Sequence, residues 1–398
     1  MRTNNYRPKV IDIFCGAGGM SLGFESAGFD VVAGIEIDPV HACVHSYNFP
    51  QCKMYRKDIC ELKGSDIVNE LGAIDVIIGG PPCQGFSLIG KREESDDRNK
   101  LIMEYMRIVD EIKPKYFVME NVSGLTIGYG KSYLERAISF IEEHGYTVVK
   151  PYKVLNAADY GVPQTRKRLF LLGARNDQVS PDYPKKHNRK VTVEEAIADL
   201  PDIDSFAELL EDDTIEYTVH PQSMYAKYLH SPKEDPTDFS ITRKWDDGKL
   251  TGSMRTVHTE ISKKRFHDTE WGKTEPISRF RKLDPKGQCN TLRAGTDKSR
   301  GAHTSPRPIN PYSDRCISVR EAERLHSFPD WFRMHKTKWH GFREVGNAVP
   351  PLLARAVAEE VLKAMGFEPQ KPDYEIELGN AAMLAASVTQ ALKEENDG

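Results

Sequence analysis

The sequence predicts an α/β protein with a doubly wound, mainly parallel sheet and a smaller, irregular second domain. Three observations predict it. Strand-like and helix-like segments alternate over the first 175 residues, which favours parallel strands covered by helices. The alternation stops after Arg175, where a stretch rich in Pro, Asp, Lys and Thr begins. An apolar helical pattern returns near the C-terminus.

Short apolar runs rich in β-branched residues mark the strands. The first run, KVIDIFC, ends in the glycines of GAGG. The runs predict strands over residues 9–15, 30–38, 73–80, 115–122, 146–155 and 168–175. Apolar residues at helical spacing predict helices over residues 20–29, 99–112, 132–145 and 347–365. The prolines of the last helix fall in its first turn, where they are tolerated.

This organisation predicts three segments along the chain. Residues 1–180 form the sheet domain, residues 181–340 form the irregular domain, and residues 341–398 return to the sheet domain. The tail after residue 379 is expected to add a short helix and then fray.

The composition is that of an ordinary soluble protein. Of the 398 residues, 39% are hydrophobic and 29% are charged, and the net charge is -4. No apolar run approaches the roughly 18 residues of a membrane span, and the N-terminus is too polar for a signal peptide. We therefore expect a cytoplasmic protein with no membrane partner.

The seven cysteines are an odd number without paired CxxC spacing, which argues against a disulfide framework and against a zinc site. No metal is expected. Six of the cysteines are interpreted as packing residues. Cys83 is different, because GGPPCQGFS places it just after a predicted strand, between prolines and a glutamine.

Charge is distributed unevenly along the irregular domain. Residues 191–240 hold 13 acidic and 2 basic side chains, whereas residues 241–310 hold 16 basic and 8 acidic ones. The second stretch is a candidate polyanion-binding face, although a solvated basic surface has the same pattern. Aromatic residues are interleaved with its charges, namely Trp245, Phe266, Trp271 and Phe280.

Ligands of doubly wound sheets bind beyond the carboxyl ends of the strands. The first strand ends in FCGAGG, and Glu36 follows about 20 residues later, where a carboxylate can reach two ribose hydroxyls. Asp58 is expected to close a third strand. These residues indicate a nucleoside-containing cofactor, with nicotinamide still open, although the glycines depart from GxGxxG.

Three further strand ends bring Cys83, Glu120 in ENV, and Arg168 in QTRKR. At one rim of the sheet they would supply a nucleophile, a proton donor and an anchor for a carbonyl oxygen. Taken singly, each also has a structural explanation as buried packing, a helix cap or a solvated charge run. Their joint occurrence at strand ends favours the chemical interpretation.

Eight blocks in order resemble the DNA (cytosine-5)-methyltransferase family of bacterial restriction-modification systems. The blocks are DIFCGAGGMSLGF, EIDP, KDI, GGPPCQGFS, ENV, QTRKR, SVREAERLHSFPDWF and GNAVPPLLA. Residues 181–315 match no general family pattern, as expected where members differ in the DNA they recognise. The resemblance implies a Rossmann-like S-adenosylmethionine-dependent catalytic domain followed by a target-recognition domain.

The resemblance also implies the cofactor site, with S-adenosylhomocysteine as product. The phenylalanine of the first block lies near the adenine, the glycine turn accommodates the methionine end, Glu36 holds the ribose, and Asp58 contacts the adenine amino group. The implied cofactor residues are Phe14, Gly16, Gly18, Gly19, Glu36, Ile37, Asp58, Ile59, Pro81, Asn347, Ala348 and Val349.

For catalysis the resemblance implies that Cys83 adds to carbon 6 of cytosine while Glu120 protonates the ring nitrogen. Arg168 grips the base carbonyl, and Arg166 supports it. Carbon 5 then becomes nucleophilic enough to be methylated. Because the thiol and the methyl donor approach opposite ring faces, the cytosine must be flipped out of the duplex.

The expected partner is double-stranded DNA. Residues 291–309 are the strongest candidate DNA-facing segment, residues 87–100 are expected to form a loop that closes over the flipped nucleotide, and the acidic stretch 191–240 should face away. The candidate DNA contacts are Gln84, Ser87, Arg293, Lys298, Arg300 and Arg307. We further expect a monomer, association with the nucleoid, and a cognate restriction endonuclease.

Three alternatives remain open. An RNA cytosine methyltransferase could use the same residues, although the long variable region favours DNA. A nicotinamide oxidoreductase would use Glu36 but has no use for Cys83, Glu120 and Arg168 together. An inactive DNA-binding module would be expected to lose one of those three residues.

Overall fold

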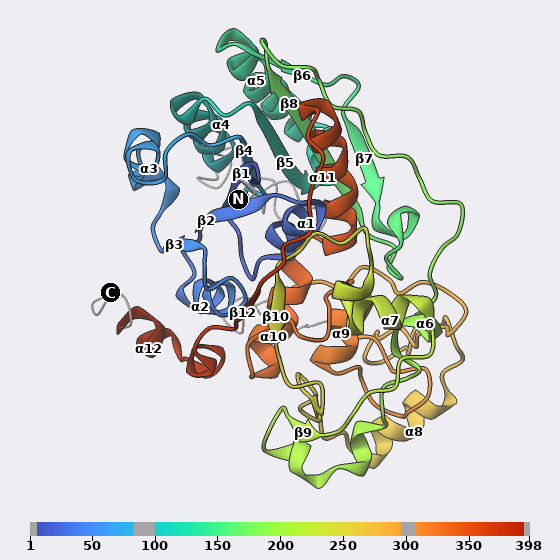
Figure 1. Cartoon of the computed structure of the whole chain (residues 1–398). Coiled ribbons are helices and arrows are strands. Elements are labelled where there is room, and N and C mark those ends of the chain that lie inside the picture. The colour runs from blue at the N-terminus through green and yellow to red at the C-terminus, as the bar shows by residue number, and fades with distance from the viewer. Residues whose placement is uncertain (1–5, 83–99, 296–306, 394–398) are drawn as a thin grey trace.

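The computed structural model describes residues 6–82, 100–295 and 307–393, and it contains one large sheet (Figure 1). The strand order is β3-β2-β1-β4-β5-β8-β6. Strand β7 also pairs with β8, at residues 167–170, whereas β6 pairs with residues 173–175. The strands are β1 Lys9–Ile13, β2 Asp30–Ile35, β3 Lys53–Tyr55, β4 Val76–Gly79, β5 Tyr116–Val122, β6 Tyr146–Val148, β7 Lys153–Asn156 and β8 Lys167–Arg175.

Strands β1 to β5 run parallel, whereas β8 pairs antiparallel with β5, β6 and β7. This confirms the predicted mainly parallel α/β sheet. The single strand predicted over residues 146–155 is wrong, because the chain forms β6 and β7 there with a break around Pro151. Proline lacks the N–H that a continuous ladder requires.

Side chains that alternate along the strands belong to two separate hydrophobic clusters. On β1, Val10 joins the cluster that contains α1 (Gly19–Ala27) and α11 (Pro351–Met365). Its neighbour Ile11 joins the opposite cluster, which contains α3 (Gly64–Leu71), α4 (Lys100–Ile112) and α5 (Tyr129–Glu143). Figure 1 shows these two groups of helices on either side of the sheet. The sheet is therefore buried on both faces, as parallel sheets require.

The C-terminal helix α11 lies directly against α1. A Cβ added at Gly23 would stand 2.4 Å from the Cβ of Ala354 and 2.6 Å from the carbonyl oxygen of Pro351. Only a glycine permits this close approach of two helices. Helix α2 (Pro39–Asn48) follows β2 and begins at Asp38, whose carboxylate accepts hydrogen bonds from the amides of Val40 and His41.

The irregular part of the chain consists of short elements joined by long loops. Its helices are α6 Val193–Ile197, α7 Met224–His230, α8 Glu260–Asp268, α9 Val319–Leu325 and α10 Lys338–Asn347. Two small sheets pair β9 (Ile215–Glu216) with β11 (Lys249–Leu250), and β10 (Thr242–Lys244) with β12 (Glu375–Glu377). The proposed domain boundaries at residues 180 and 340 stay predictions, because one hydrophobic cluster runs through both regions.

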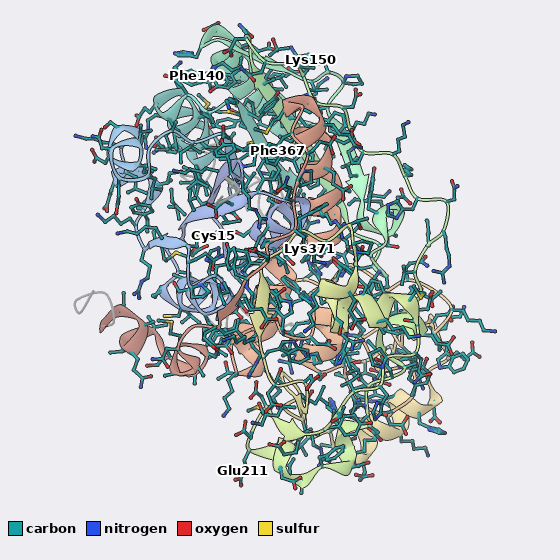
Figure 2. The ribbon with its side chains drawn as sticks, in the orientation of Figure 1. Cys15, Phe140, Lys150, Glu211, Phe367 and Lys371 are labelled. Atoms are coloured by element: carbon teal, nitrogen blue, oxygen red, sulfur yellow. The ribbon has the colours of Figure 1, made fainter. Side chains whose placement is uncertain are left out.

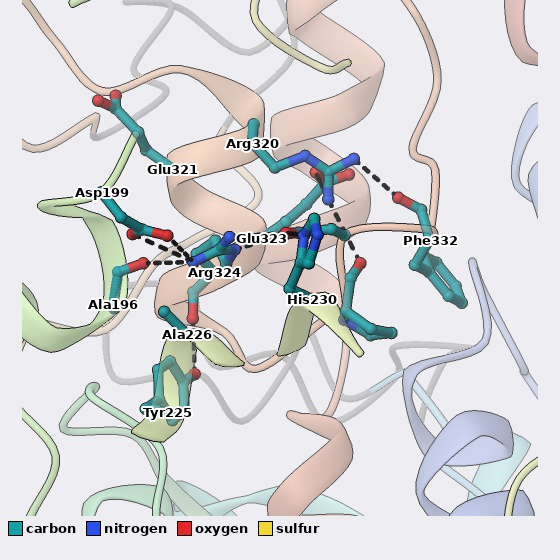
Figure 3. A network of polar contacts seen from close by, with 12 residues as sticks. Ala196, Asp199, Tyr225, Ala226, His230, Arg320, Glu321, Glu323, Arg324 and Phe332 are labelled. Carbon is teal, nitrogen blue, oxygen red and sulfur yellow. Dashed lines mark hydrogen bonds and ion pairs between the residues drawn. The ribbon is translucent and has the colours of Figure 1, made fainter. Parts of the chain in front are cut away.

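Buried arginines of α9 hold these loops together (Figure 3). Arg324 forms ion pairs with Asp199 at 3.3 Å and with Asp330, and it also donates to the carbonyl of Ala196. Arg320 pairs with Glu323 at 3.0 Å. Because buried charges are costly unless paired, this network fixes the positions of the segments it joins.

The tail after α11 crosses back over the molecule. Lys371 donates to the carbonyls of Lys233 and Asp235 and lies centrally in the side-chain view (Figure 2). The tail then forms β12 and ends in α12 (Val388–Lys393), which packs near α2. The short helix predicted for the tail is therefore present.

Five of the six described cysteines are buried, including Cys15 in the sheet domain (Figure 2). Cys60 is exposed, so its interpretation as a packing residue was wrong. No helix within the described ranges is long and apolar enough to cross a membrane. The described residues likewise hold no group of three or more His, Cys, Asp or Glu side chains suited to a metal ion.

Candidate active site and cofactor pocket

A glycine turn follows β1 at the carboxyl edge of the sheet. Phe14, Gly16 and Gly18 have φ values of 62°, 54° and 102°, all in the left-handed region that glycine adopts most easily. A Cβ added at Gly16 would meet no atom within 4 Å, so the turn has open space on that side. The amide of Gly16 donates to Glu36 Oε2 at 2.9 Å, which holds the carboxylate beside the turn.

Helix α1 starts immediately after this turn, at Gly19. Its N-cap, Gly18, has no side chain to cap the helix, and no acidic residue lies in the first turn. No side chain of the helix itself caps the first N–H groups of α1, although the buried carboxylate of Asp12 accepts from the backbone of Ser21 in the first turn. A helix terminus of this kind favours an anionic group of a ligand.

The block GNAVP, far away in sequence, comes back to the same turn. A Cβ added at Gly19 would stand 2.3 Å from the carbonyl oxygen of Val349 and 3.1 Å from the Cβ of Ala348. Asn347 is exposed at the end of α10, next to this contact. The structure thus joins the first and last sequence blocks at one point.

The rim beyond β2 and β3 presents both polar and apolar groups. Ile37 is 63% exposed directly after Glu36, which leaves an apolar surface free at the edge. Asp58 caps a short 3-10 turn and accepts from the amide of Cys60 at 2.9 Å. The side chain of Ile59 is only 2% exposed and lies in the core, so only its backbone could face a ligand.

The ends of β5 and β8 bring two of the predicted catalytic residues together. Glu120 is buried, and its Oε1 lies 2.8 Å from Nε of Arg168. Its other oxygen faces Gly80, where an added Cβ would be 3.0 Å away. Nδ2 of Asn121 donates to the carbonyl of Pro81 at 3.1 Å. The chain that leads to Cys83 is therefore fastened to β5 beside Glu120.

Burial raises the pKa of Glu120, and the positive charges of Arg168 and Arg166 act against this rise. The net increase favours the protonated carboxyl more than in water, which suits a proton donor. Cys83, Gln84, Ser87 and the predicted loop up to residue 99 lie outside the described residues.

Comparison with known proteins shows the family to which the chain belongs. A family model for C-5 cytosine-specific DNA methylases matches residues 8–363. The chain belongs to this family. The methylase is 53% identical over 389 residues to Type II methyltransferase M.XorII of Xanthomonas oryzae pv. oryzae, a match that covers 97% of this chain and 92% of the relative.

Two further relatives support this family assignment. Type II methyltransferase M.AgeI of Thalassovita gelatinovora is 31% identical over 433 residues, covering 90% of this chain and 100% of the relative. The crystal structure of an E. coli prophage-encoded protein, assigned as a DNA modification methyltransferase, has a TM-score of 0.76 and 32% identity. That match covers 90% of the methylase and 99% of the solved chain.

The family establishes the reaction. The methylase transfers a methyl group from S-adenosylmethionine to carbon 5 of cytosine in DNA. In this family the reaction proceeds through a covalent bond between a cysteine and the cytosine ring.

Arg166 is fully buried, close enough to the rim for its charge to act on Glu120. Its guanidinium donates to the carbonyls of Leu292, Gly346 and Ala348 at 2.7 to 2.8 Å. It therefore acts as a bracket between the GNAVP block and the segment that begins at Thr291. Its support of Arg168 stays a prediction.

Two further buried residues contact the GNAVP block, and the sequence analysis did not predict a role for either. Gln164 is fully buried, and its Nε2 donates to Nδ1 of His326 at 2.9 Å. Nε2 of His326 then donates to the carbonyl of Ala348 at 3.0 Å. Burial lowers the pKa of His326 and keeps the ring neutral, as this pattern requires. Their presence within QTRKR and RLHSF was the only available signal.

A second missed group lies beneath the glycine turn. Asp12 is 1% exposed, and Ser21 donates to its Oδ2 at 2.7 Å while contacting Nε2 of His45 at 3.1 Å. Burial raises the pKa of Asp12 to about 7. This carboxyl carries a proton much more readily than a surface aspartate.

Of the six predicted DNA contacts, Arg293 and Arg307 lie within the described residues. Arg293 is exposed. Arg307 is partly buried, with its guanidinium 4.6 Å from the centre of the Phe342 ring. Its guanidinium thus packs against an aromatic ring, and its contact with DNA stays a prediction. Lys298 and Arg300 lie outside the described residues.

The aromatic residues of the basic stretch mostly do not form a binding face. Phe266 is 2% exposed and lies in a small core with Phe280, Ile309 and Cys316. Trp245 packs against the main core. Only Trp271 of the four is strongly exposed, at 57%. Phe266, Phe280 and Trp245 thus supply packing in this part of the chain.

Proposed function

We propose that this methylase modifies one specific duplex sequence, as the modification enzyme of a type II restriction-modification system, with Cys83 as its nucleophile. The observation that carries the residue assignment is the buried pair of Glu120 and Arg168 at 2.8 Å. The hydrogen bond from Asn121 to Pro81 supports it, because it ties the chain before Cys83 to the same strand end.

The chain's own residues then divide the work as follows. The thiolate of Cys83 forms a bond to carbon 6 of the flipped cytosine, and the carboxyl of Glu120 gives its proton to the neighbouring ring nitrogen. The ring electrons are thereby directed to carbon 5. Arg168 donates to the ring carbonyl oxygen, which orients the base and stabilises negative charge that develops there. Once carbon 5 carries the methyl group, a base removes the carbon 5 proton and the bond between carbon 6 and sulfur breaks, which releases the thiolate. The ring nitrogen returns its proton to Glu120, and the aromatic ring is restored.

The described residues fit S-adenosylmethionine, which supplies an electrophilic methyl group when bound. The uncapped N-terminus of α1 suits its carboxylate, and the open side of Gly16 leaves room for a ligand. Glu36 offers carboxylate oxygens to the ribose hydroxyls, and the exposed side chain of Ile37 offers an apolar surface to the adenine. Phe14, Asp58 and Asn347 complete the proposed pocket.

Duplex DNA is proposed to lie against the lobe that carries the exposed Arg293, with Gln84, Ser87, Lys298 and Arg300 as further contacts. The names of the relatives as type II methyltransferases support pairing with a restriction endonuclease that cleaves the same site. We also propose that the methylase acts as a monomer in the cytoplasm, bound to the nucleoid. Light scattering of the purified protein would test the monomer.

The decisive experiment compares the wild type with Cys83→Ser, using a labelled methyl donor and either duplex DNA or transfer RNA. The wild type should label only DNA at cytosine carbon 5, and conversion sequencing should find one recurring sequence. Cys83→Ser should bind the methyl donor normally and transfer nothing. Methyl transfer by the variant would contradict the assigned nucleophile, and labelling of RNA alone would contradict the proposed substrate.

A further inference from the structure

The turn at residues 275–280, with the sequence EPISRF, has no role in the site described above. It is the closed tip of a hairpin. The amide of Glu275 donates to the carbonyl of Phe280 at 2.8 Å, and the amide of Arg279 donates to the carbonyl of Glu275 at 2.9 Å. An antiparallel bridge between Thr274 and Arg281 continues the hairpin below the tip.

Glu275 fixes this turn from within. The residue is 1% exposed, and its carboxylate accepts from the amides of Ile277 at 3.1 Å and Ser278 at 2.5 Å. The same carboxylate lies 3.8 Å from the guanidinium of Arg265. Hydrogen bonds to a charged carboxylate are strong, and here they keep a short turn in one conformation. The tip is thus a rigid feature of the lobe.

The tip exposes the side chains of Ile277 and Arg279, and both are placed in a way that does not favour folding. Ile277 is 70% exposed, although it is apolar. Arg279 is exposed and has a φ of 60°, a left-handed conformation that is strained for a residue with a side chain and that glycine adopts easily. Exposed apolar groups and backbone strain at one place are typical of binding sites.

The turn is connected to the reaction rim by backbone pairing. In the chain that leaves it, the amide of Leu283 donates to the carbonyl of Ile309 at 3.0 Å, and Ile309 is the last residue of the proposed DNA-facing segment 291–309. It then pairs Cys289 with Pro163 and Thr165, each at 2.8 Å, beside the catalytic strand end. Glu275 is the one acidic residue between positions 275 and 282, and it is buried and paired with Arg265, so the exposed part of the tip is also suited to a polyanion.

We propose that Arg279 and Ile277 read base edges in the major groove of the target duplex, and so help to determine which sequence is methylated. Arg279 has the fork geometry for O6 and N7 of a guanine, and Ile277 is suited to the methyl group of a thymine. A purely phosphate-binding tip would need neither an apolar side chain nor a rigid turn. The proposal rests on the proposed action on a specific duplex sequence.

The test measures sequence preference with a pool of duplexes randomised around the target cytosine. Arg279→Gly removes the side chain and suits the left-handed backbone, so the turn should keep its shape. Ile277→Ala removes the apolar contact. Ile261→Ala is the matched control, because Ile261 is 74% exposed on α8, outside the turn. Melting temperature and methyl-donor binding should remain at wild-type values in all three variants.

Arg279→Gly should lose about 10- to 100-fold of its preference at one base pair, the discrimination of a single bidentate contact. Ile277→Ala should lose several-fold at a neighbouring pair, whereas Ile261→Ala should keep the wild-type profile. An unchanged profile in both turn variants would overturn the proposal. So would a uniform loss of activity at all sequences, since that would identify phosphate contacts. A wild type without any sequence preference would instead refute the proposed function itself.

Discussion

The contact between Gly19 and the GNAVP block should control cofactor binding, and Gly19→Ala tests this. The added methyl group would stand 2.3 Å from the carbonyl oxygen of Val349, where ordinary contacts are 3.4 to 4 Å. Backbone must therefore move by about 1 Å, and overpacking of this kind costs about 1 to 3 kcal/mol. If that shift opens the cofactor pocket, affinity for S-adenosylmethionine should fall about 10- to 100-fold.

Gly23→Ala provides the matched control, because it lies one turn further along α1. Its methyl group would clash equally, 2.4 Å from the Cβ of Ala354, but away from the glycine turn. Both variants should lose comparable thermal stability, whereas only Gly19→Ala should lose affinity in isothermal titration with the cofactor. Equal loss of affinity in both variants, or none in Gly19→Ala, would refute the reasoning.

Three further predictions concern charged residues. Glu120→Gln cannot donate a proton to the ring, so kcat should fall by about 10²- to 10⁴-fold while cofactor affinity stays unchanged in titration. Arg166→Lys leaves buried carbonyls unpaired and should cost about 3 kcal/mol of unfolding free energy in urea, where a loss below about 1 kcal/mol would count against the bracket. Asp12 has its pKa raised to about 7, so its contribution to stability is full below about pH 4 and disappears as pH rises to 7. Asp12→Asn has no such titration and should gain about 2 to 3 kcal/mol relative to the wild type between pH 5 and pH 8, measured by urea unfolding at each pH. A constant difference would contradict the assignment.

The sheet could be predicted because its pattern is local. Strands buried on both faces are continuous apolar runs, and the covering helices have apolar residues at regular spacing. The direction of β8 has no such signal, since parallel and antiparallel strands have similar composition. The break at Pro151 could have been noticed, because a proline inside an apolar run is a warning against one continuous strand.

The irregular lobe resisted prediction because its stability depends on tertiary pairing. In REAER, charged residues alternate in a way typical of a solvated helix, yet Arg320 and Arg324 are 1% and 0% exposed. Their carboxylate partners include Asp199, which lies more than a hundred residues away. In the same way, Phe266 reads as an aromatic residue of a basic surface but fills a small core. Neither composition nor periodicity contains this information.

The contacts of Arg166 tie the catalytic rim to the irregular part of the chain, in addition to the hydrophobic cluster that runs through both. One guanidinium, that of Arg166, binds a carbonyl at Leu292, where the lobe returns to the rim, and two carbonyls at Gly346 and Ala348, beside the cofactor turn. A displacement of either segment would break hydrogen bonds to the other, because all three acceptors share one rigid planar donor. Arg166 therefore links the GNAVP block beside the glycine turn to the segment that begins at Thr291 through contacts with backbone carbonyls alone.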